Sequence, residues 1–507
     1  MLVHELITRG QADALAIVDH KRRITYKELA TAVHNCRNRL YAAGVRTGDR
    51  VGIFSRNSAD FIFAYMAAAS LGAVSVPINF QLSSREIAYI IKDAGIRVLL
   101  AHEPLNLIDS LAALRCGLKV VQLDIKTCGK LDKKAAAAPL LPADFDEHKP
   151  CAIIYTSGTT GNPKGAVLSH ANLITNCQQL EKQGMDCNAS RHVLCVLPMY
   201  HAFGWTCAVL YALYCGARII ILDSFTPKET ISVIREEQVT DMYVVPSICS
   251  LLTKLASPED MKTLRLVVSG GTILPLQIQQ DFIQKFHVDI CECYGLSETS
   301  PILTINPPSR PIVGSCGKIV PDVRWKIIDH ENQEVPLGQT GELVVKGPNV
   351  MLGYWNLPDV NQEVMRGGWF HTGDVARADG DNYIYIVDRI KDMIISMGEN
   401  IYPREVEELI YQFPGIHEAA VIGIEDKLRG QAGACFYSLH PGAAISIREL
   451  KKFLQNNLAL YKIPREFHEM DKLPRTATGK IAKRKILAAF QSSKKVSKKT
   501  EKEVSQC

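Results

Sequence analysis

The chain has 507 residues, of which 47% are hydrophobic and 22% charged, and its formal net charge is +5. At roughly 150 residues per domain this length accommodates about three folding units with ample core. The composition is that of an ordinary globular protein, and so small a net charge gives no indication of a nucleic-acid partner. Much of the excess lies in residues 491–507, where five lysines and two glutamates leave a net +3. We interpret this tail as a disordered, solvated segment, with weak attraction to anionic lipid or nucleic acid left open.

Cysteine usage and the N-terminus indicate a cytoplasmic protein. Fifteen cysteines occur without a Cys-x-x-Cys pair, which is typical of reduced thiols. The N-terminus lacks a basic region followed by an apolar one, so no secretory signal is expected. Two uncharged stretches, 61–82 and 193–217, are long enough to span a bilayer. Because Gly72 and Pro77 interrupt the first and Pro198 the second, we interpret both as buried helix and strand.

The first elements predict alternating strands and helices. Thr25-Tyr-Lys-Glu28 is a capping box, and the apolar residues after it recur at helical spacing until Gly44. Helix-length segments then separate short apolar runs, the rhythm of βα units around a parallel sheet. We expect strands at 51–54, 73–76, 98–100 and 120–123 in a first lobe, then a connector at 126–150. A second lobe is expected to hold strands at 153–155, 193–197, 218–222, 242–245, 266–268 and 290–294.

The pattern changes twice toward the C-terminus. From about residue 311 short strands are closely spaced, at 325–328, 341–345 and 383–387, which predicts a small β-rich subdomain. Beyond Lys391 a helix at 403–411, a strand at 419–423 and a helix opening at the capping box Ser446-Ile-Arg-Glu449 predict a separate unit. The expected fold is therefore α/β: an N-terminal domain of two lobes and the β-rich subdomain at 1–390, a mobile α+β domain at 391–490, and the tail.

A loop rich in hydroxyls and glycine follows the strand at 153–155. It reads Thr156-Ser-Gly-Thr-Thr-Gly-Asn-Pro-Lys164-Gly. Hydroxyl donors, backbone N–H groups freed by glycine and one lysine suit polyphosphate. A turn of this composition is by itself commonly only a turn. It is not a Walker A motif, in which Gly-Lys-Ser/Thr opens a helix, because Lys164 leads into an apolar run.

Three further blocks carry polar groups. Glu292-Cys-Tyr-Gly-Leu-Ser-Glu-Thr299 ends an apolar strand, where α/β sheets bind ligands. Trp369-Phe-His-Thr-Gly-Asp374 places a carboxylate after Thr-Gly, which alone is more often a β-turn. Leu473-Pro-Arg-Thr-Ala-Thr-Gly-Lys480 places a lysine on a glycine-containing loop, which alone is more often a solvated surface.

In this order the four blocks resemble the motifs of the acyl-adenylate-forming enzymes, which include acyl-CoA synthetases, aryl-CoA ligases, luciferases and peptide-synthetase adenylation domains. The resemblance covers residues 25 to 481. It implies that ATP and a small-molecule carboxylic acid give acyl-AMP and pyrophosphate with Mg²⁺, and that coenzyme A then takes the acyl group. It also implies that the C-terminal domain rotates between the two steps about a hinge at Lys391. A homodimer is left open.

The resemblance assigns a role to each matching position. In catalysis it places Lys480, Glu298, Thr299 and His201, with Glu298 and Thr159 as Mg²⁺ ligands. For the nucleotide it implies Thr156, Ser157, Gly158, Thr159, Thr160, Gly161, Lys164, Gly271, Tyr294, Asp374 and Arg389. It places His201, Trp205, Gly270 and Gly295 in the acyl pocket, and Ser396, Gly398 and Glu399 along the channel for coenzyme A.

The segment Leu197-Pro-Met-Tyr-His201-Ala-Phe-Gly-Trp205 matches the border of the acyl pocket. It contains no acid, whereas amino-acid-activating relatives need a counter-charge for the substrate ammonium. The apolar residues after Trp205 make a fatty acid the first choice, because each buried methylene contributes about 0.8 kcal/mol. An aromatic acid such as benzoate, cinnamate or succinylbenzoate is the alternative. A luciferase-like oxygenase and a non-catalytic nucleotide-binding relative are further alternatives, and His201 has the alternative role of a core histidine.

Overall fold

The computed structural model describes residues 1–117, 119–133, 135–156, 163–397, 399–426, 428–475 and 481–492. The chain divides into two compact units. Unit 1 contains residues 1–326, 344–371 and 379–385, and unit 2 contains residues 327–343, 372–378 and 386–507. The predicted boundary at 390/391 lies within unit 2, and it stays a prediction about folding domains.

Unit 1 contains a large, mainly parallel sheet. In order its strands are β15 (Lys318–Ile319), β14 (Ile302–Ile305), β13 (Ile290–Gly295), β12 (Leu266–Ser269), β11 (Asp241–Val244), β9 (His192–Cys195), β10 (Arg218–Ile221), β1 (Leu15–Asp19) and β2 (Arg22–Thr25). The strands from β13 to β1 run parallel, whereas β14, β15 and β2 are antiparallel to their neighbours. The parallel part confirms the predicted rhythm of the second lobe.

A second sheet in unit 1 corresponds to the first lobe. Its strands are, in order, β18 (Gly353–Tyr354), β8 (Lys164–Ser169), β7 (Pro150–Thr156), β4 (Val74–Pro77), β3 (Arg50–Phe54), β5 (Val98–Ala101) and β6 (Val121–Asp124). The strand predicted at 153–155 was assigned to the second lobe, and that assignment is wrong. It is β7, which pairs with β4 here, while the N-terminal strand β1 pairs with β10 of the other sheet. Sequence order does not determine which sheet a strand joins, because the pairing is decided by contacts between distant residues.

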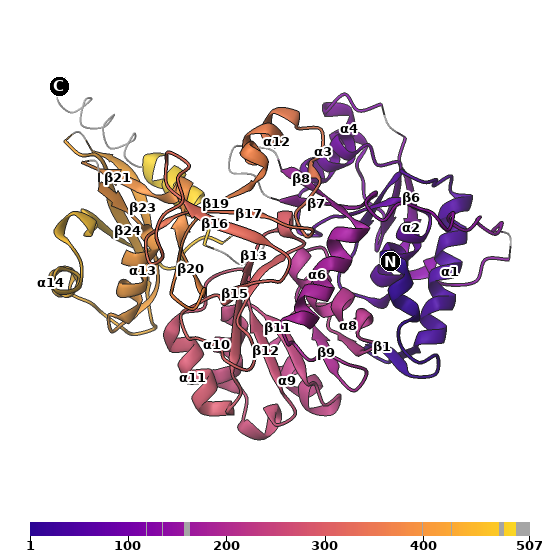
Figure 1. The fold of residues 1–507 in the computed structure, drawn as a ribbon, viewed down its shortest axis with the longest axis horizontal. Helices are drawn as coiled ribbons and strands as arrows, with labels where there is room; N and C mark the ends of the chain where they lie inside the picture. Colours follow the sequence, from indigo (N-terminus) through magenta and orange to yellow (C-terminus); the bar gives the residue numbers. More distant parts are fainter. Residues whose placement is uncertain are drawn as a thin grey trace. The chain divides into compact units, whose positions relative to one another are not determined.

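Helices pack along both sheets. The predicted capping box is present: Thr25 accepts a hydrogen bond from Glu28 N–H at the start of α1 (Tyr26–Ala42). The helix α2 (Ala59–Ser70) is buried throughout, and in Figure 1 α10 (Pro246–Leu255) lies between α9 (Pro227–Glu236) and α11 (Leu276–Phe286) along the larger sheet. Within the described parts of the chain, no helix is both long and apolar enough to cross a bilayer. The other helices of unit 1 are α3 (Ser84–Ala94), α4 (Ile108–Ala113), α5 (Ile125–Cys128), α6 (His170–Lys182), α7 (Ala202–Trp205), α8 (Tyr211–Tyr214) and α12 (Pro358–Val364).

The β-rich region is confirmed as a further sheet. Its order is β16 (Arg324–Ile328), β17 (Gly341–Lys346), β19 (Phe370–Ala378) and β20 (Ile384–Arg389), and the chain passes between the two units within these strands. Thr372-Gly-Asp374 lies inside β19. The alternative reading of this motif as an isolated β-turn is therefore wrong.

Unit 2 has a sheet of its own. Its order is β22 (Glu399–Ile401), β21 (Ile394–Ser396), β24 (Gly430–Leu439) and β23 (Ile416–Asp426), and β25 (Glu466–Glu469) also pairs with β24. The helices α13 (Pro403–Gln412) and α14 (Ile447–Asn457) and the strand β23 were predicted, whereas β21, β22, β24 and β25 were missed. The sequence of β24, Gly-Gln-Ala-Gly-Ala-Cys-Phe-Tyr-Ser-Leu, begins with small residues that show no alternation of large apolar and polar side chains.

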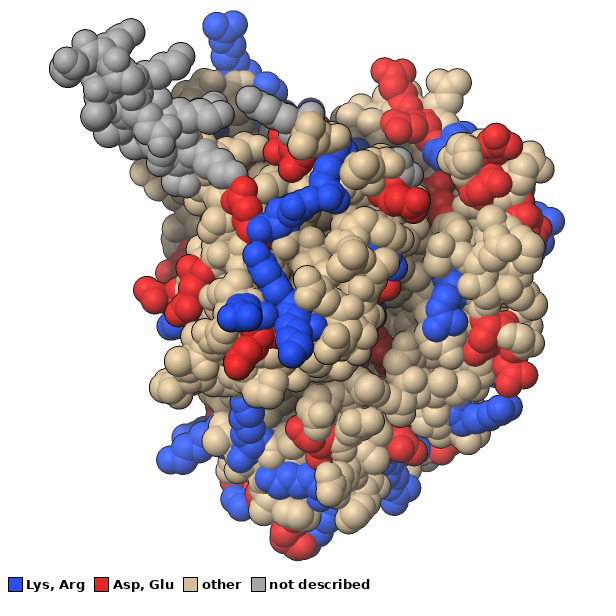
Figure 2. Space-filling view, turned by 90° about the vertical axis from the view of Figure 1, so that its left-hand side faces the viewer, with Lys and Arg blue, Asp and Glu red and all other residues tan. Residues whose placement is uncertain are grey.

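Charged side chains on the surface are mixed in sign. On the face shown in Figure 2, side chains of both signs are scattered among uncharged ones, and several Lys and Arg side chains gather near the middle. Pairs such as Arg23 with Glu237 at 2.8 Å and Lys182 with Asp322 at 2.6 Å join elements distant in sequence. Exposed pairs of this kind contribute only about 0 to 1 kcal/mol each, so the stability of the fold rests on its buried core.

The N-terminal helix η1 (Val3–Thr8) contributes Val3, Leu6 and Ile7 to that core. The backbone N–H of Val3 donates to Nδ1 of His170 at 3.2 Å. Burial lowers the pKa of His170 to about 3, helped by the nearby His4 and the N-terminal ammonium, and burial also lowers the pKa of His4. Both imidazoles are therefore neutral in the folded protein at neutral pH.

We predict that the free energy of unfolding falls as the pH drops from about 6.5, the unfolded value of histidine, toward about 3, the folded value of His170. In this range the unfolded state binds more protons than the folded state, so lowering the pH favours unfolding. Thermal unfolding of wild type and His170→Gln across this range is the test. The amide of the introduced glutamine would offer Val3 an acceptor that does not titrate. An equal loss of stability with pH in both proteins would contradict the prediction.

Candidate active site

The first predicted site residues lie where two antiparallel strands of unit 1 meet. β7 ends at Thr156, β8 begins at Lys164, and the two residues are partners in the ladder. The Thr156 hydroxyl donates to the carbonyl oxygen of Lys164 at 3.4 Å. Lys164 thus opens a strand and not a helix, which confirms that this is not a Walker A loop. The predicted phosphate-binding residues Ser157, Gly158, Thr159, Thr160 and Gly161 lie outside the described residues.

The second group follows the carboxyl end of β13, the position where α/β sheets bind ligands. Tyr294 and Gly295 end the strand, and Glu298 lies on a 3-10 turn, η4 (Ser297–Thr299). Glu298 is only 8% exposed, and its Oε1 accepts a hydrogen bond from the Tyr354 hydroxyl at 2.6 Å. We call η4, which carries Glu298, the acid turn. Because η4 also contacts β8, the structure brings the acid turn and the strand of Lys164 together.

Thr299 is fully buried, and its hydroxyl donates to the carbonyl oxygen of Pro301 at 2.7 Å. The backbone N–H of Leu296 donates to the same hydroxyl at 3.1 Å. The Thr299 side chain therefore helps to close the acid turn. Its contact with the acyl phosphate stays a prediction.

The donor set near Glu298 suits Mg²⁺ carried by a nucleotide. Within the described ranges no group of three or more His, Cys, Asp or Glu residues could enclose a metal. Mg²⁺ typically binds through one or two carboxylates together with substrate phosphates and water. A mostly buried carboxylate on a turn that contacts the strand after a candidate phosphate loop meets that requirement.

The predicted border of the acyl pocket is a bend followed by the helices α7, η2 (Thr206–Leu210) and α8. His201 caps α7, with its Nδ1 3.4 Å from the backbone N–H of Phe203. The two aromatic residues of α7 face different neighbours. The ring of Trp205 packs against Tyr65 and Phe61 of α2, with centroids 4.3 and 5.4 Å apart, and Trp205 is 2% exposed. Its role in the pocket stays a prediction.

Phe203 lies beside Gly270, a predicted pocket residue, and was not singled out in the sequence. A Cβ atom placed on Gly270 would lie 2.5 Å from the Cys293 sulfur and 3.1 Å from the Phe203 ring. Phe203 also makes an edge-to-face contact with Tyr243, at 6.3 Å between centroids. The carboxyl ends of β11, β12 and β13 and the helix α7 therefore meet at Gly270. Gly271, which follows it, has a φ of 77°, a backbone conformation that favours glycine.

Unit 2 holds the third predicted group. Asp374 is 2% exposed, and its Oδ1 lies 3.1 Å from Nε of Arg389. The Thr372 hydroxyl accepts a hydrogen bond from the backbone N–H of Asp374 and donates to the carbonyl oxygen of Leu343. The structure thus brings together the two residues that the resemblance assigns to the ribose.

The remaining predicted residues of unit 2 lie further along the chain. Lys391 is on the turn η6 (Ile390–Asp392), Ser396 is buried at the end of β21, and Glu399 is exposed at the start of β22, opposite Ser396. Gly398 and Lys480 lie outside the described residues. The segment just after Lys480 is anchored by an ion pair of 2.7 Å between Lys483 and Glu407 of α13. The roles of all these residues stay predictions.

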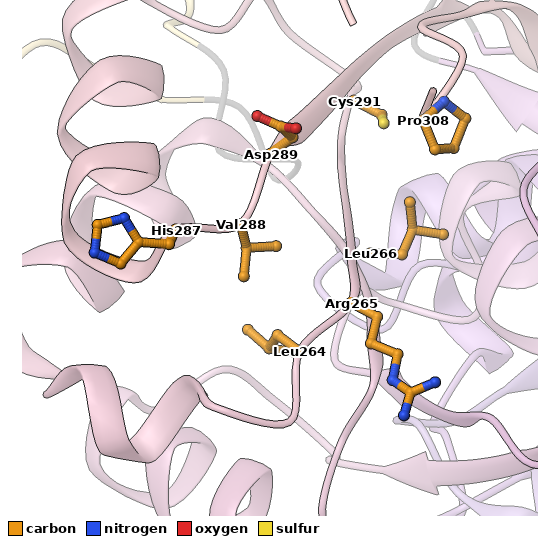
Figure 3. A pocket seen from close by; sticks show the side chains of 8 residues that line it. All are labelled: Leu264, Arg265, Leu266, His287, Val288, Asp289, Cys291 and Pro308. Atoms are coloured by element: carbon orange, nitrogen blue, oxygen red, sulfur yellow. The ribbon is translucent and has the colours of Figure 1, made fainter. Parts of the chain in front are cut away.

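A cavity of about 220 Å³ lies at the opposite end of the larger sheet (Figure 3). Most of the residues that line it lie just before or at the start of β12 and β13. They are Leu264, Arg265, Leu266, His287, Val288, Asp289 and Cys291, and Pro308 completes the lining. The predicted site residues follow the carboxyl ends of these strands. The cavity is therefore separate from the candidate active site.

Comparison with known proteins identifies the family. The model of the AMP-binding enzyme family matches residues 5–355, and that of the AMP-binding enzyme C-terminal domain matches residues 405–480. The chain therefore belongs to the AMP-binding enzyme family. It is 37% identical to a feruloyl-CoA synthase of Amycolatopsis sp, over 95% of this chain and 97% of the relative. It is 31% identical to a long-chain-fatty-acid–CoA ligase of Bacillus subtilis, over 94% and 91% of the two chains.

Comparison with solved structures supports the same family. ATP-bound MatB from Rhodopseudomonas palustris superposes with a TM-score of 0.89 at 29% identity, over 97% of this chain and 99% of that one. An o-succinylbenzoate CoA synthetase from Bacillus subtilis, in complex with its acyl-adenylate intermediate, gives 0.85 at 29% identity, over 95% and 97%. These similarities confirm the predicted family and α/β fold. Together with the relatives they make this chain an ATP-dependent acid–thiol ligase.

We predict that Gly295→Ala destabilises unit 1. The added Cβ would lie 1.8 Å from the carbonyl oxygen of Pro301, a backbone atom that no rotamer change can move. The expected loss in the free energy of unfolding is about 1–3 kcal/mol or more, as for other overpacked sites. Denaturant unfolding measures it. Gly380→Ala is the matched control, because nothing lies within 4 Å of its Cβ position; equal losses in the two variants would contradict the prediction.

Proposed function

We propose that the enzyme converts an apolar carboxylic acid, ATP and coenzyme A into acyl-CoA, AMP and pyrophosphate. In the first step a carboxylate oxygen attacks the α-phosphorus of ATP and pyrophosphate leaves. In the second the sulfur of coenzyme A attacks the acyl carbon, AMP leaves and the thiol proton is released. The observation that carries the proposal is the buried Glu298 turn in contact with the strand of Lys164, within a chain that matches the AMP-binding family almost throughout.

Each predicted site residue would have a distinct role in the reaction. Lys164 would bind the phosphates, Asp374 would accept hydrogen bonds from the ribose hydroxyls with Arg389 beside it, and Tyr294 and Gly271 would contact the nucleotide. Thr159 and Glu298 would hold Mg²⁺, which when bound neutralises charge on the phosphates. His201 would lie near the substrate carboxylate. Ser396, Gly398 and Glu399 would line the path of coenzyme A, and Lys391 would act as the hinge between the two steps.

For the substrate we propose an acid with an aromatic ring, which reverses the order favoured by the sequence. The Phe203 ring lies close to Gly270, with the Tyr243 ring edge-to-face against it, and a flat group could stack on Phe203 there. The feruloyl-CoA synthase at 37% identity and a 4-coumarate–CoA ligase 3 of Oryza sativa at 31% point the same way.

A fatty acid is the second candidate. The residues of η2 and α8 after Trp205 are buried and mostly apolar, and the 31%-identical Bacillus subtilis ligase acts on long-chain fatty acids by its name. Because burying each methylene contributes about 0.8 kcal/mol, a long apolar slot would reveal itself as affinity that rises with chain length.

A pyrophosphate-release screen tests the function and separates the two substrates. Ferulate, 4-coumarate, cinnamate and benzoate are compared with fatty acids of graded length, each with and without coenzyme A. We expect the highest kcat/KM for a ring-containing acid. A steady rise with fatty chain length would select the second candidate, and no release with any acid would refute the proposed ligase activity.

We predict that Lys480→Ala lowers the rate of acyl-AMP formation by about 10² to 10³. Negative charge accumulates around the α-phosphorus as the carboxylate attacks, and an ammonium aimed at that charge is most effective in the transition state. Conversion of supplied acyl-AMP to the thioester should be nearly unaffected. Single-turnover assays of the two half-reactions measure this, and equal losses in both would rule out the assigned role.

We predict that Gly270→Ala selects against bulky acids. The new methyl group must displace the Cys293 sulfur or the Phe203 ring and so narrows the space beside them. The ratio of kcat/KM for ferulate to that for a short straight-chain acid should fall about tenfold, within the range that one methyl group commands in an apolar pocket. Thermal unfolding checks that the variant is folded. If this ratio of kcat/KM values did not change, the acyl group would not bind beside Gly270.

A further inference from the structure

Tyr354 contacts both charged residues of unit 1 that the proposed function assigns to the triphosphate and its metal. Its hydroxyl donates to Oε1 of Glu298 at 2.6 Å, and its ring lies 5.4 Å from the ammonium nitrogen of Lys164. The first contact is a short, charge-assisted hydrogen bond. The second is within the range of a cation–π interaction. One side chain therefore touches an acid and a base that are far apart in the sequence.

The backbone holds Tyr354 firmly at this place. It lies on β18, paired with Ala166 of β8. Its N–H donates to Oδ1 of Asn361 at 2.6 Å, and its carbonyl oxygen accepts from Nδ2 of the same residue at 2.9 Å. The neighbouring Trp355 donates from its backbone N–H to Gly165 at 2.8 Å and from its indole N–H to the carbonyl oxygen of Asp93 at 3.1 Å. The ring of Tyr354 is thus attached to a fixed strand, whereas Glu298 and Lys164 have flexible side chains.

We propose that Tyr354 is a positioning residue that orients the Glu298 carboxylate for Mg²⁺ and the Lys164 ammonium for the nucleotide phosphates. This inference rests on the proposed function. A hydroxyl bound to Oε1 fixes the rotation of the carboxylate and directs Oε2 away from the tyrosine. Residues that hold a metal ligand in this way commonly change metal affinity or activity about 10- to 100-fold when they are replaced.

Two substitutions distinguish the hydroxyl contact of Tyr354 from its ring contact. Tyr354→Phe keeps the ring beside Lys164 and removes only the hydroxyl. It should raise the Mg²⁺ concentration that gives half-maximal enhancement of ATP binding about tenfold, with little effect on ATP binding without Mg²⁺. Tyr354→Leu removes the ring as well and should weaken ATP binding even without the metal. AMP binding should be unchanged in both variants, because AMP lacks the β- and γ-phosphates.

Isothermal titration calorimetry of ATP and AMP over a series of Mg²⁺ concentrations, with no acid present, measures these effects without turnover. Glu298→Gln and the double variant Tyr354→Phe/Glu298→Gln complete a double-mutant cycle. If Tyr354 acts through Glu298, the double variant should be no worse than Glu298→Gln alone.

Tyr383→Phe is the matched control. Tyr383 also donates from its hydroxyl, to the carbonyl oxygen of Arg310 at 2.8 Å, and its ring also lies near a lysine, Lys318, at 4.8 Å. Removal of the Tyr383 hydroxyl should leave the Mg²⁺ dependence of ATP binding unchanged. The positioning role would be overturned if Tyr354→Phe showed the same Mg²⁺ dependence of ATP binding as the wild type, or if Tyr383→Phe shifted it equally. In either case, pyrophosphate release by the wild type would still support the ligase activity. Failure of the wild type itself to release pyrophosphate would instead refute the proposed function.

Discussion

Backbone hydrogen bonds of residues 351–355 set the spacing of the candidate site in unit 1. Met351 donates to the carbonyl oxygen of Glu298 at 2.8 Å, and Trp355 donates to that of Gly165 at 2.8 Å. This short segment is thereby bonded on one side to the turn that carries Glu298 and on the other to β8, the strand after the candidate phosphate loop. Because these bonds join main chains, the spacing does not depend on the rotamers of long charged side chains. Placing charged groups accurately before substrate binds is the main way in which proteins stabilise phosphoryl transfer.

The buried carboxylates of the candidate site each have a partner of suitable chemistry. Glu298 accepts from a tyrosine hydroxyl and Asp374 lies against an arginine, as burial of charge requires. Around Gly270, by contrast, the surroundings are Phe203 and a cysteine sulfur. Apolar contacts discriminate weakly between acids of similar size. If these residues act as proposed, relatives named for ferulate and for long-chain fatty acids would share the polar groups and differ mainly at apolar positions, and this chain is 37% and 31% identical to two such relatives.

Local signals in the sequence predicted local structure well. The capping box at Thr25 and the strand-ending motif at Glu292–Thr299 depend on residues within one turn or one strand, and both formed as expected. The strands β7 and β1 were not assigned to their sheets, because their partners are far away in the chain. Glu298 and Lys164 were singled out by their motifs, and their roles stay predictions. Tyr354 was not singled out, because its contacts are with the distant Glu298 and Lys164, and nothing near Tyr354 in the sequence indicates them.

The aromatic residues of α7 show how helix geometry limits a motif. Successive residues of an α-helix are turned by about 100°, so Phe203 and Trp205, two positions apart, point about 200° apart and cannot both face one pocket. The structure directs Trp205 toward Phe61 and Tyr65 of α2, and Phe203 toward Gly270 and Tyr243. From the motif we assigned Trp205 to the pocket and did not single out Phe203. In the proposed pocket, the contact with Gly270 makes Phe203 the residue that a substrate ring would meet, while the assignment of Trp205 to the pocket stays a prediction.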